Sequence, residues 1–396
     1  MAWANSDWTK SGIRDTYRWV MCDNRTLKEI ADMTGFVDGR ISASYEGDLK
    51  YSGSITVSNS NFVTGRLLRC YYTATLESEG RSKTICLGTF FTGNDQMRYL
   101  HGRYTGTIEL YSMLKSQTDS KLMVPVTFKK DNSALNSWWQ LLQASGSKAY
   151  GIARVKDAKW KKNETMDFGE TSLTALNRIA EFLNGQITCD AKGHIVLEPY
   201  VVPSKKPVSY SVPSGASSLV FEGVDATFNR TDCVNRFGVR YEQVVEKKVQ
   251  DGVYKAKYTD SSGVTHEKGS PKYRTEKVKV PIYGQARLAK DNAYSFEKRG
   301  RFIDEVDTLQ NMDPETKEKA NEIAARRLKR FARGDVQYTF NSYYMPYDIG
   351  QVVRFTYKDN EKAAGIDIDG LVTNMELTLG ITGLRMQTTI RRVRAR

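Results

Sequence analysis

Two clusters of short, alternating apolar segments, one toward each end of the 396-residue chain, constrain the fold more than any other feature. In the first cluster, apolar and polar residues alternate over 51–57, and apolar segments at 67–72 and 83–91 follow Gly- and Ser-rich links. In the second, strands are predicted over 335–344, 351–357, 370–379 and 384–393, with two more within 219–241. Short strands at this spacing are typical of a small barrel or sandwich. We therefore predict two antiparallel β-barrels, one within about 40–130 and one built from 214–245 plus 335–396.

Sequence with helical periodicity separates the two clusters. Residues 132–144 and 172–183 carry apolar side chains at core spacing, and Gly146 and Gly185 follow them as helix stops. Turn residues at 190–193 indicate a hairpin over 186–198. These segments predict an α+β insertion.

Two further helices are predicted outside this insertion. One runs over 314–333, capped by Asp313 and ended by Gly334, with Leu328 and Phe331 on its buried face. Its basic residues Lys317, Arg326, Lys329 and Arg330 are expected on the opposite face. The other is a short helix from a cap at Asn24 to a stop at Gly35.

The predicted fold class is mainly β with an α+β insertion. Residues 1–130 are expected to form the first barrel domain and 131–213 the α+β domain. The second barrel is expected from 214–245 and 335–396, and 246–334 from a polar insertion plus a helix-bearing subdomain. Residues 243–300 are the most polar part of the chain, and we predict an extended hairpin or an insertion there.

The formal net charge of +13 invites a nucleic-acid interpretation, but the basic residues are scattered and acidic residues lie among most of them. They fall in three groups: Lys159, Lys161 and Lys162; Lys247, Lys248, Lys255 and Lys257; and Arg391, Arg392, Arg394 and Arg396. A dedicated DNA-binding domain usually concentrates its charge on one element. Two interpretations of these groups stay open: they lie on solvated surfaces, or they contact an acidic partner surface or passing DNA.

The cellular setting is indicated by what the sequence lacks. It has no run of 18 apolar residues and no basic segment followed by an apolar one at its start, so we predict no membrane span, no signal peptide and folding in a cytoplasm. The five cysteines are odd in number and have no CxxC pair: Cys22, Cys70, Cys86, Cys189 and Cys233. Reduced structural thiols are expected, with a disulfide or zinc site as the alternatives.

No constellation of residues predicts catalysis. His101, His194 and His266 lie far apart, and no nucleophile-elbow, phosphate-loop or dinucleotide motif is present. Asp367 and Asp369 are the one carboxylate pair of interest, explained by turn chemistry before Gly370, by a bound cation, or by catalysis. Trp138 and Trp139 could form a stacking platform or pack in the core. We predict no catalytic, cofactor-binding or metal-binding residues and no cofactor.

The order of these elements resembles the hub family of tailed-phage tail tips and baseplates. The similar segments are 66–72 (RLLRCYY), 85–90 (ICLGTF), 105–112 (TGTIELYS), the helix 172–183 with its hairpin, the helix 314–333, 345–353 (MPYDIGQVV) and 384–388 (LRMQT). In that family, two barrels related to the tail-tube subunit are split by an α+β domain. Residues 243–300 match no part of the family pattern.

The resemblance implies a non-enzymatic structural protein, a homotrimer whose ring closes the tail tube. It implies as partners the tail tube or distal tail protein, the tape measure protein and other tail-tip proteins, with DNA only in passage and no stable membrane association. The location would be the virion tail, after synthesis in the host cytoplasm. Two other functions stay open: a host-surface-binding module that uses the basic loops, and a cell-wall hydrolase that uses Asp367 and Asp369.

Overall fold

The computed structural model describes residues 5–10, 12–100, 103–212, 219–228, 233–259, 261–292, 294–309, 316–331, 336–358 and 365–395. The chain divides into two compact units, Met1–Phe228 with Asp335–Arg396, and Asn229–Gly334. Both are built mainly from antiparallel strands, which confirms the predicted fold class.

Thirteen strands of the first unit form one sheet. The N-terminal strands are β1 (Ile13–Cys22), β2 (Glu29–Met33), β3 (Phe36–Ser44), β4 (Tyr51–Ser58), β5 (Leu67–Leu76), β6 (Arg81–Leu100) and β7 (Arg103–Ser112). The others are β13 (Val208–Ser211), β14 (Val220–Phe228), β18 (Val336–Tyr343), β19 (Val352–Tyr357), β20 (Ile366–Gly380) and β21 (Gly383–Ala395). The order along the main path is β14-β18-β21-β20-β3-β4-β7-β6-β5-β1-β2, with β19 on β20 and β13 on β19.

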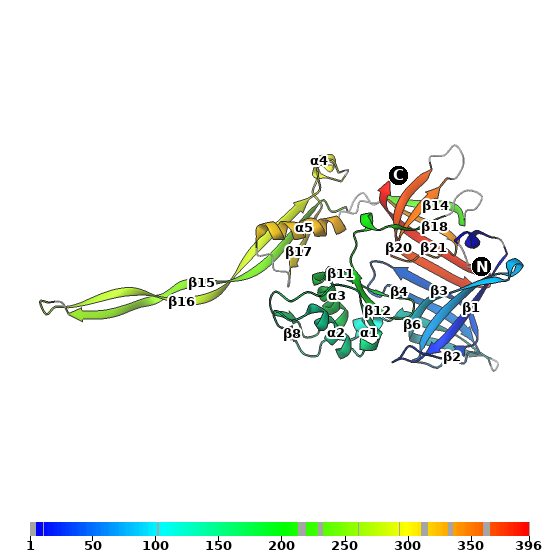
Figure 1. Ribbon diagram of the computed structural model, residues 1–396, viewed down its shortest axis with the longest axis horizontal. Coiled ribbons are helices and arrows are strands. Elements are labelled where there is room, and N and C mark those ends of the chain that lie inside the picture. The colour runs from blue at the N-terminus through cyan, green and yellow to red at the C-terminus, as the bar shows by residue number, and fades with distance from the viewer. Residues whose placement is uncertain are drawn as a thin grey trace. The chain divides into compact units, whose positions relative to one another are not determined.

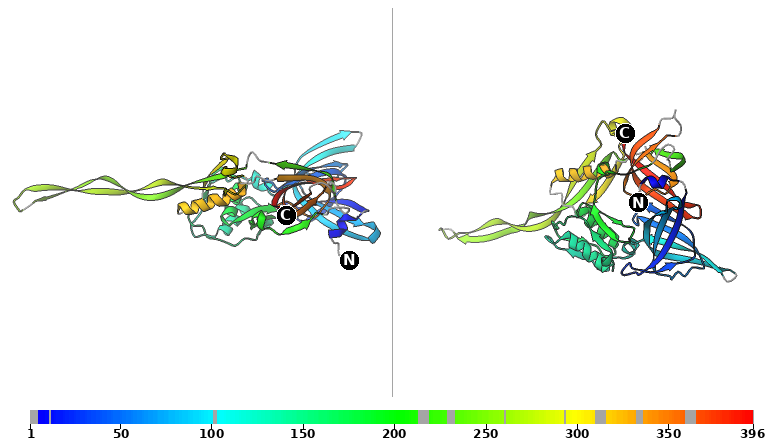
Figure 2. Two further views of the ribbon diagram at one scale, coloured as in Figure 1. Left: turned by 90° about the horizontal axis from the view of Figure 1, so that it is seen from above. Right: turned by 45° about the vertical axis from the view of Figure 1, so that its right-hand side comes forward.

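The two strand clusters meet at one junction, which we call the seam. There β20 pairs antiparallel with β3, from Asn374 opposite Ser44 to Leu379 opposite Gly39. Bulges at Asp369/Gly370 and Val372/Asn374 interrupt the pairing of β20 with β21, and bulges bend a strand. The first part of β20 can therefore pair with β19 while its second part pairs with β3. Figures 1 and 2 show the blue N-terminal strands and the orange and red C-terminal strands side by side.

One hydrophobic core lies beneath both clusters. It contains Trp19, Ile41 and Phe90 from the N-terminal strands and Phe355 and Ile390 from the C-terminal ones. Within the described residues, no pairing joins the two ends of the strand path, so a closed barrel is not seen. The two predicted barrels are instead two halves of one continuous sheet, because the seam joins their edges.

The α+β insertion belongs to the same unit. It comprises α1 (Lys115–Asp119), β8 (Val126–Phe128), α2 (Ala134–Ala144), β9 (Gly151–Ala153), β10 (Glu164–Met166), α3 (Ser172–Phe182), β11 (Gly185–Cys189) and β12 (Ile195–Pro199). The predicted helices α2 and α3 and the hairpin β11–β12 are confirmed. Ser133 and Thr171 cap the helices by accepting hydrogen bonds from the N–H groups of Asn136 and Thr174, so Ser133 and not Asn132 begins α2.

The helix predicted over 24–35 is wrong. Asp23 Oδ1 accepts hydrogen bonds from the N–H groups of Arg25 and Thr26 and closes a turn, after which β2 pairs with the edge of β1. Gly35 has φ +76° between β2 and β3, and a Cβ there would lie 2.2 Å from the carbonyl oxygen of Ser58. Its glycine therefore serves a tight turn between strands and not a helix end.

The second unit is built around a long hairpin. Its strands β15 (Arg236–Thr259) and β16 (Thr265–Arg287) pair along their length, which confirms the predicted extended hairpin. The unit also contains α4 (Phe296–Arg299), β17 (Asp304–Leu309) and α5 (Lys317–Phe331). Residues 236–241 pair with β16 and β17, so this part of the predicted second barrel lies in another sheet.

Helix α5 packs against the base of the hairpin. Ala320, Ala324 and Leu328 are buried with Phe237 and Val239. A Cβ at Gly284 would lie 2.3 Å from the backbone of Ala320, so only glycine allows this approach. Leu328 is buried and Lys317 and Arg326 are exposed, as predicted. Asp313, Pro314 and the side chains of Lys329, Arg330 and Phe331 lie outside the described residues.

Candidate functional site

The face of the large sheet opposite its core is polar on both sides of the seam. Its side chains alternate with the buried ones along each strand, and those on β18, β21, β20, β3 and β4 are mostly small or uncharged. The uncharged ones include Thr339, Asn341, Gln387, Thr389, Asn374, Thr378, Ser42, Ser52 and Ser54, and the charged ones are Arg40, Glu376, Arg385 and Arg391. We call this surface the polar face.

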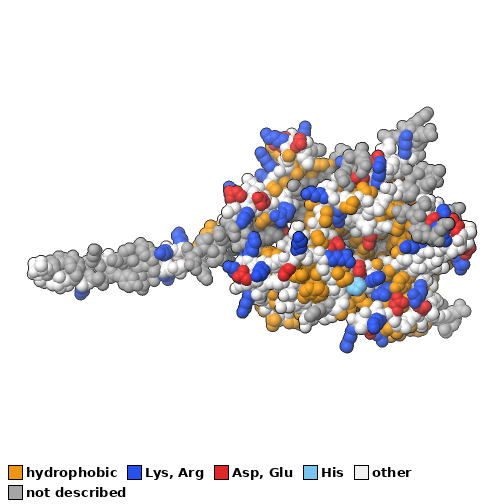
Figure 3. Space-filling view, viewed as in Figure 1, with side chains coloured by type: hydrophobic (Ala, Val, Ile, Leu, Met, Phe, Trp, Pro, Cys, Tyr) orange, Lys and Arg blue, Asp and Glu red, His pale blue; other side chains and the backbone are white. Residues whose placement is uncertain are grey.

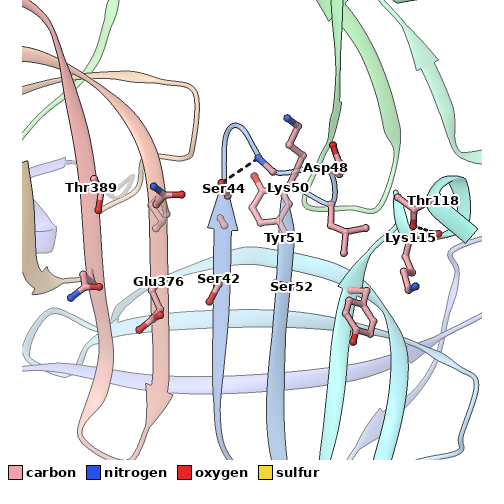
Figure 4. Close-up of a pocket in the computed structure, with 17 residues that line it drawn as sticks. Ser42, Ser44, Asp48, Lys50, Tyr51, Ser52, Lys115, Thr118, Glu376 and Thr389 are labelled. Atoms are coloured by element: carbon pink, nitrogen blue, oxygen red, sulfur yellow. Dashed lines mark hydrogen bonds between the residues drawn. The ribbon is translucent and has the colours of Figure 1, made fainter. Parts of the chain in front are cut away.

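An open hollow of about 680 Å³ lies on this face where β20 and β21 meet β3, β4 and β7 (Figure 4). Ser42, Ser44, Ser52 and Thr389 line it, and α1 closes one side through Lys115 and Thr118. Lys115 is held by Asp119, with Nζ 2.6 Å from Oδ1. Apolar side chains, among them Leu49, Tyr111 and Met375, line the hollow together with these polar groups.

Polar contacts tie the N-terminal and C-terminal segments together around the hollow. Arg40 pairs with Glu376 across the seam, and Arg391 Nη1 lies 2.8 Å from Glu46 Oε1. The Tyr51 hydroxyl donates to Asp348 Oδ2 at 2.7 Å. Burial raises the pKa of Asp348 and the pKa of Tyr51. These groups therefore hold the seam in place.

The structure places Asp367 and Asp369 within β20 and not in a turn. Asp367 pairs with Arg354 at 3.3 Å between Oδ2 and Nη2. Asp369 is fully buried and lies opposite Arg354 and Arg394 in the strand registers. The turn interpretation is wrong, because the bulge at Gly370 continues the strand.

Of the three histidines, the structure describes the side chain of His194 alone. The Nδ1 atom of His194 lies 2.9 Å from the carboxylate oxygen Oδ2 of Asp190, which accepts the hydrogen bond inside the turn of the β11–β12 hairpin. His101 and the side chain of His266 lie outside the described residues. In the described part of the chain, no three His, Cys, Asp or Glu side chains gather as a metal site. No helix in that part is long and apolar enough to cross a membrane.

No disulfide joins any of the five cysteines, all of which lie in the described residues, and four of them are buried. Burial raises the pKa of Cys86 to about 11 and that of Cys189 to about 12. These two thiols are therefore protonated at neutral pH and are poor nucleophiles.

The tryptophan pair lies in the core of the insertion. Trp138 is fully buried and its ring meets that of Trp139 edge-on, with centroids 4.8 Å apart. This confirms core packing over a stacking platform. Of the basic groups, Lys159 and Lys161 are exposed, whereas Arg391 is buried and paired with Glu46. Arg391 is therefore not part of a solvated face, and the side chains of Arg394 and Arg396 lie outside the described residues.

The polar face was not predicted from the sequence. Its alternation was visible in each strand, but the pairing of β20 with β3 joins residues more than 300 positions apart and leaves no local signal.

Similarity to known proteins lies in the fold. No protein-family model and no curated protein matches the sequence. A tail protein from Neisseria meningitidis MC58 aligns with a TM-score of 0.61 over 95% of this chain and 96% of that chain, at 10% identity. The 43 kDa tail protein of prophage MuSo2 from Shewanella oneidensis aligns with a TM-score of 0.59 over 95% and 98%, at 12% identity. A prophage tail protein from Listeria monocytogenes EGD-e gives 0.52 over 94% of each chain, at 10% identity. The chain therefore has the fold of these tail proteins.

Proposed function

We propose that the chain is a structural hub subunit of a phage tail tip or baseplate, where it forms a ring that closes the tail tube and attaches other tail proteins. The observation that carries the proposal is the continuous sheet with one polar face, in a chain that has the fold of tail proteins over nearly its whole length. The role is non-enzymatic.

The seam supports a ring. Each chain contributes two strand clusters joined edge to edge, so three chains would present six clusters around an axis. A ring of this kind matches a hexameric tube above it, and closed symmetry is the rule for such assemblies. The predicted domain division, with a tube-like domain at each end of the chain, belongs to this proposal.

The polar face supports a lumen. Proteins hold DNA mainly through Lys and Arg on its phosphates. On this face, Arg40 is neutralised by Glu376 and Lys115 by Asp119. Most of the other side chains are serine, threonine, asparagine and glutamine, and Arg385 is an exposed cation on β21. DNA passing along such a surface would meet hydroxyl and amide groups and few free cations, so the surface would bind it only weakly and let it pass.

The proposed partners are further copies of the chain in a trimer, the tail tube or distal tail protein, the tape measure protein and other tail-tip proteins. DNA would be present only in passage, and no stable membrane association is proposed. The location would be the virion tail after synthesis in the host cytoplasm.

Deletion of the gene tests this function. Electron micrographs of the mutant lysate should show filled heads without complete tails, and the wild-type gene supplied from a plasmid should restore them. Normal, infectious tails in the mutant would refute the proposal, and so would cleavage of peptidoglycan by the purified chain.

A further inference from the structure

An exposed apolar cluster lies on the α+β insertion. Two segments run antiparallel there, with Lys121 bridged to Thr171 and Val126 opposite Met166. Between these positions, Gly169 N–H donates to the Leu122 carbonyl at 2.8 Å. Met123, Val124 and Phe168 are 80%, 65% and 69% exposed.

Buried neighbours anchor the two segments that carry the cluster. Leu122, Phe128 and Met166, which neighbour the exposed side chains in sequence, are buried in the core of the insertion. Together the three exposed side chains present on the order of 400 Å², which is the size of the largest apolar patch on a typical monomer and is often functional. Figure 3 shows hydrophobic side chains at the surface over the region where Figure 1 places β8 and α3.

Exposed lysines lie before and after the cluster along the chain and on an adjoining loop. Lys121, Lys129 and Lys130 belong to one of its segments, and all are exposed. The loop with exposed Lys159 and Lys161 lies beside them, because Lys130 N–H donates to Asn163 Oδ1 and Asp131 N–H to the Trp160 carbonyl, both at 2.9 Å.

Acidic side chains offset little of this positive charge. Arg178 neutralises Glu170, because its Nη1 donates hydrogen bonds to Oε1 at 2.9 Å and to Oε2 at 2.8 Å. Asp157 accepts the N–H groups of Leu135 and Ala158. Asp131 and Asp167 in the two segments and Asp157 beside Lys159 are exposed acids, so five exposed lysines face three carboxylates.

We propose that Met123, Val124 and Phe168, with their lysine rim, form a docking surface for another tail protein, which presents a large apolar side chain flanked by Asp and Glu. We call it the lysine-rimmed patch. An apolar centre with a polar rim is the anatomy of a protein–protein interface, whereas a nucleic-acid surface is led by clustered basic residues. A second copy is a poor complement, because the chain itself carries +13.

This inference rests on the proposed function, since the partner is another component of the tail. It is tested by placing the photoreactive amino acid p-benzoylphenylalanine at position 168 of the full chain and irradiating the assembled particles. Mass spectrometry of the linked peptides identifies the partner. Because Phe168 is exposed, the replacement should leave the thermal unfolding temperature unchanged.

The expected product joins position 168 to a different tail protein, at a segment with an apolar side chain and an excess of Asp and Glu. The double variant Lys121→Glu with Lys129→Glu should reduce its yield at least tenfold. Lys83→Glu is the matched control, an exposed lysine on β6 outside the insertion, and should leave the yield unchanged.

Two kinds of failure are distinguishable. If the chain is present in purified particles but position 168 links to nothing, to a copy of itself, to DNA or to lipid, the docking inference is wrong and the hub function stands. If the chain is absent from particles, the hub function is wrong and the inference falls with it.

Discussion

Replacing Leu379 with alanine tests whether the seam makes one cooperative body out of two strand clusters. Leu379 is fully buried, pairs with Gly39 across the seam and belongs to the shared core. The change removes three carbons, worth about 2.4 kcal/mol at roughly 0.8 kcal/mol each. The cavity left behind brings the expected loss to about 3–4 kcal/mol. Thr378→Ala is the matched control, because Thr378 is the exposed neighbour on the same strand, and it should cost less than about 0.5 kcal/mol.

Hydrogen exchange followed by mass spectrometry gives the readout on both sides of the seam. In Leu379→Ala, protection of the core amides should fall about a hundredfold or more both in peptides from β3 and β4 and in peptides from β20 and β21. Two independently stable domains would behave differently: protection would fall in the C-terminal peptides alone. That result would refute the single-body interpretation of the sheet.

Three further outcomes are expected. Glu164 is buried beside Arg178, and burial raises its pKa to about 7 from an ordinary value near 4.5. The free energy of unfolding that Glu164 contributes is therefore highest below pH 4.5 and falls as the pH rises through 7. Glu164→Gln should thus gain in thermal unfolding temperature relative to the wild type between pH 5 and pH 8, by the equivalent of up to about 3 kcal/mol, and an unchanged difference would contradict the assigned cause. Leu328→Ala should cost about 2–4 kcal/mol and Arg326→Ala less than about 0.5 kcal/mol, and thermal stabilities in the reverse order would show that α5 packs through its other face. Thiol titration in denaturant, together with non-reducing gels, should find all five cysteines free, whereas a protected pair would contradict the cytoplasmic folding expected for the chain.

Local pattern was enough to predict the elements whose stability is itself local. Helices α2 and α3 have an apolar face and a side-chain cap within a few residues of each other, and the β15–β16 hairpin pairs neighbouring segments. The helix expected at 24–35 was predicted from the helical spacing of Leu27, Ile30 and Ala31. The prediction is wrong because this segment forms β2, which pairs with the edge of β1. Tertiary pairing decided that segment.

The candidate sites lay beyond local reasoning for a related reason. The polar face exists only because β20 meets β3, and its serines and threonines are unremarkable in each strand alone. No local pattern marks Met123, Val124 and Phe168, and only the structure shows that their neighbours fill the core and leave them exposed. Asp367 and Asp369 were candidate site residues in the sequence, but in β20 Asp367 pairs with Arg354 and Asp369 is buried.

The most direct test of the hub function is a cryo-electron microscopy map of the assembled tail tip. We predict three copies of the chain around the tail axis, with Ser42, Ser52 and Thr389 of the polar face turned toward the lumen. A map in which the chain is absent from the tail, or in which that face is turned outward and the lumen is lined by another protein, would contradict the proposal.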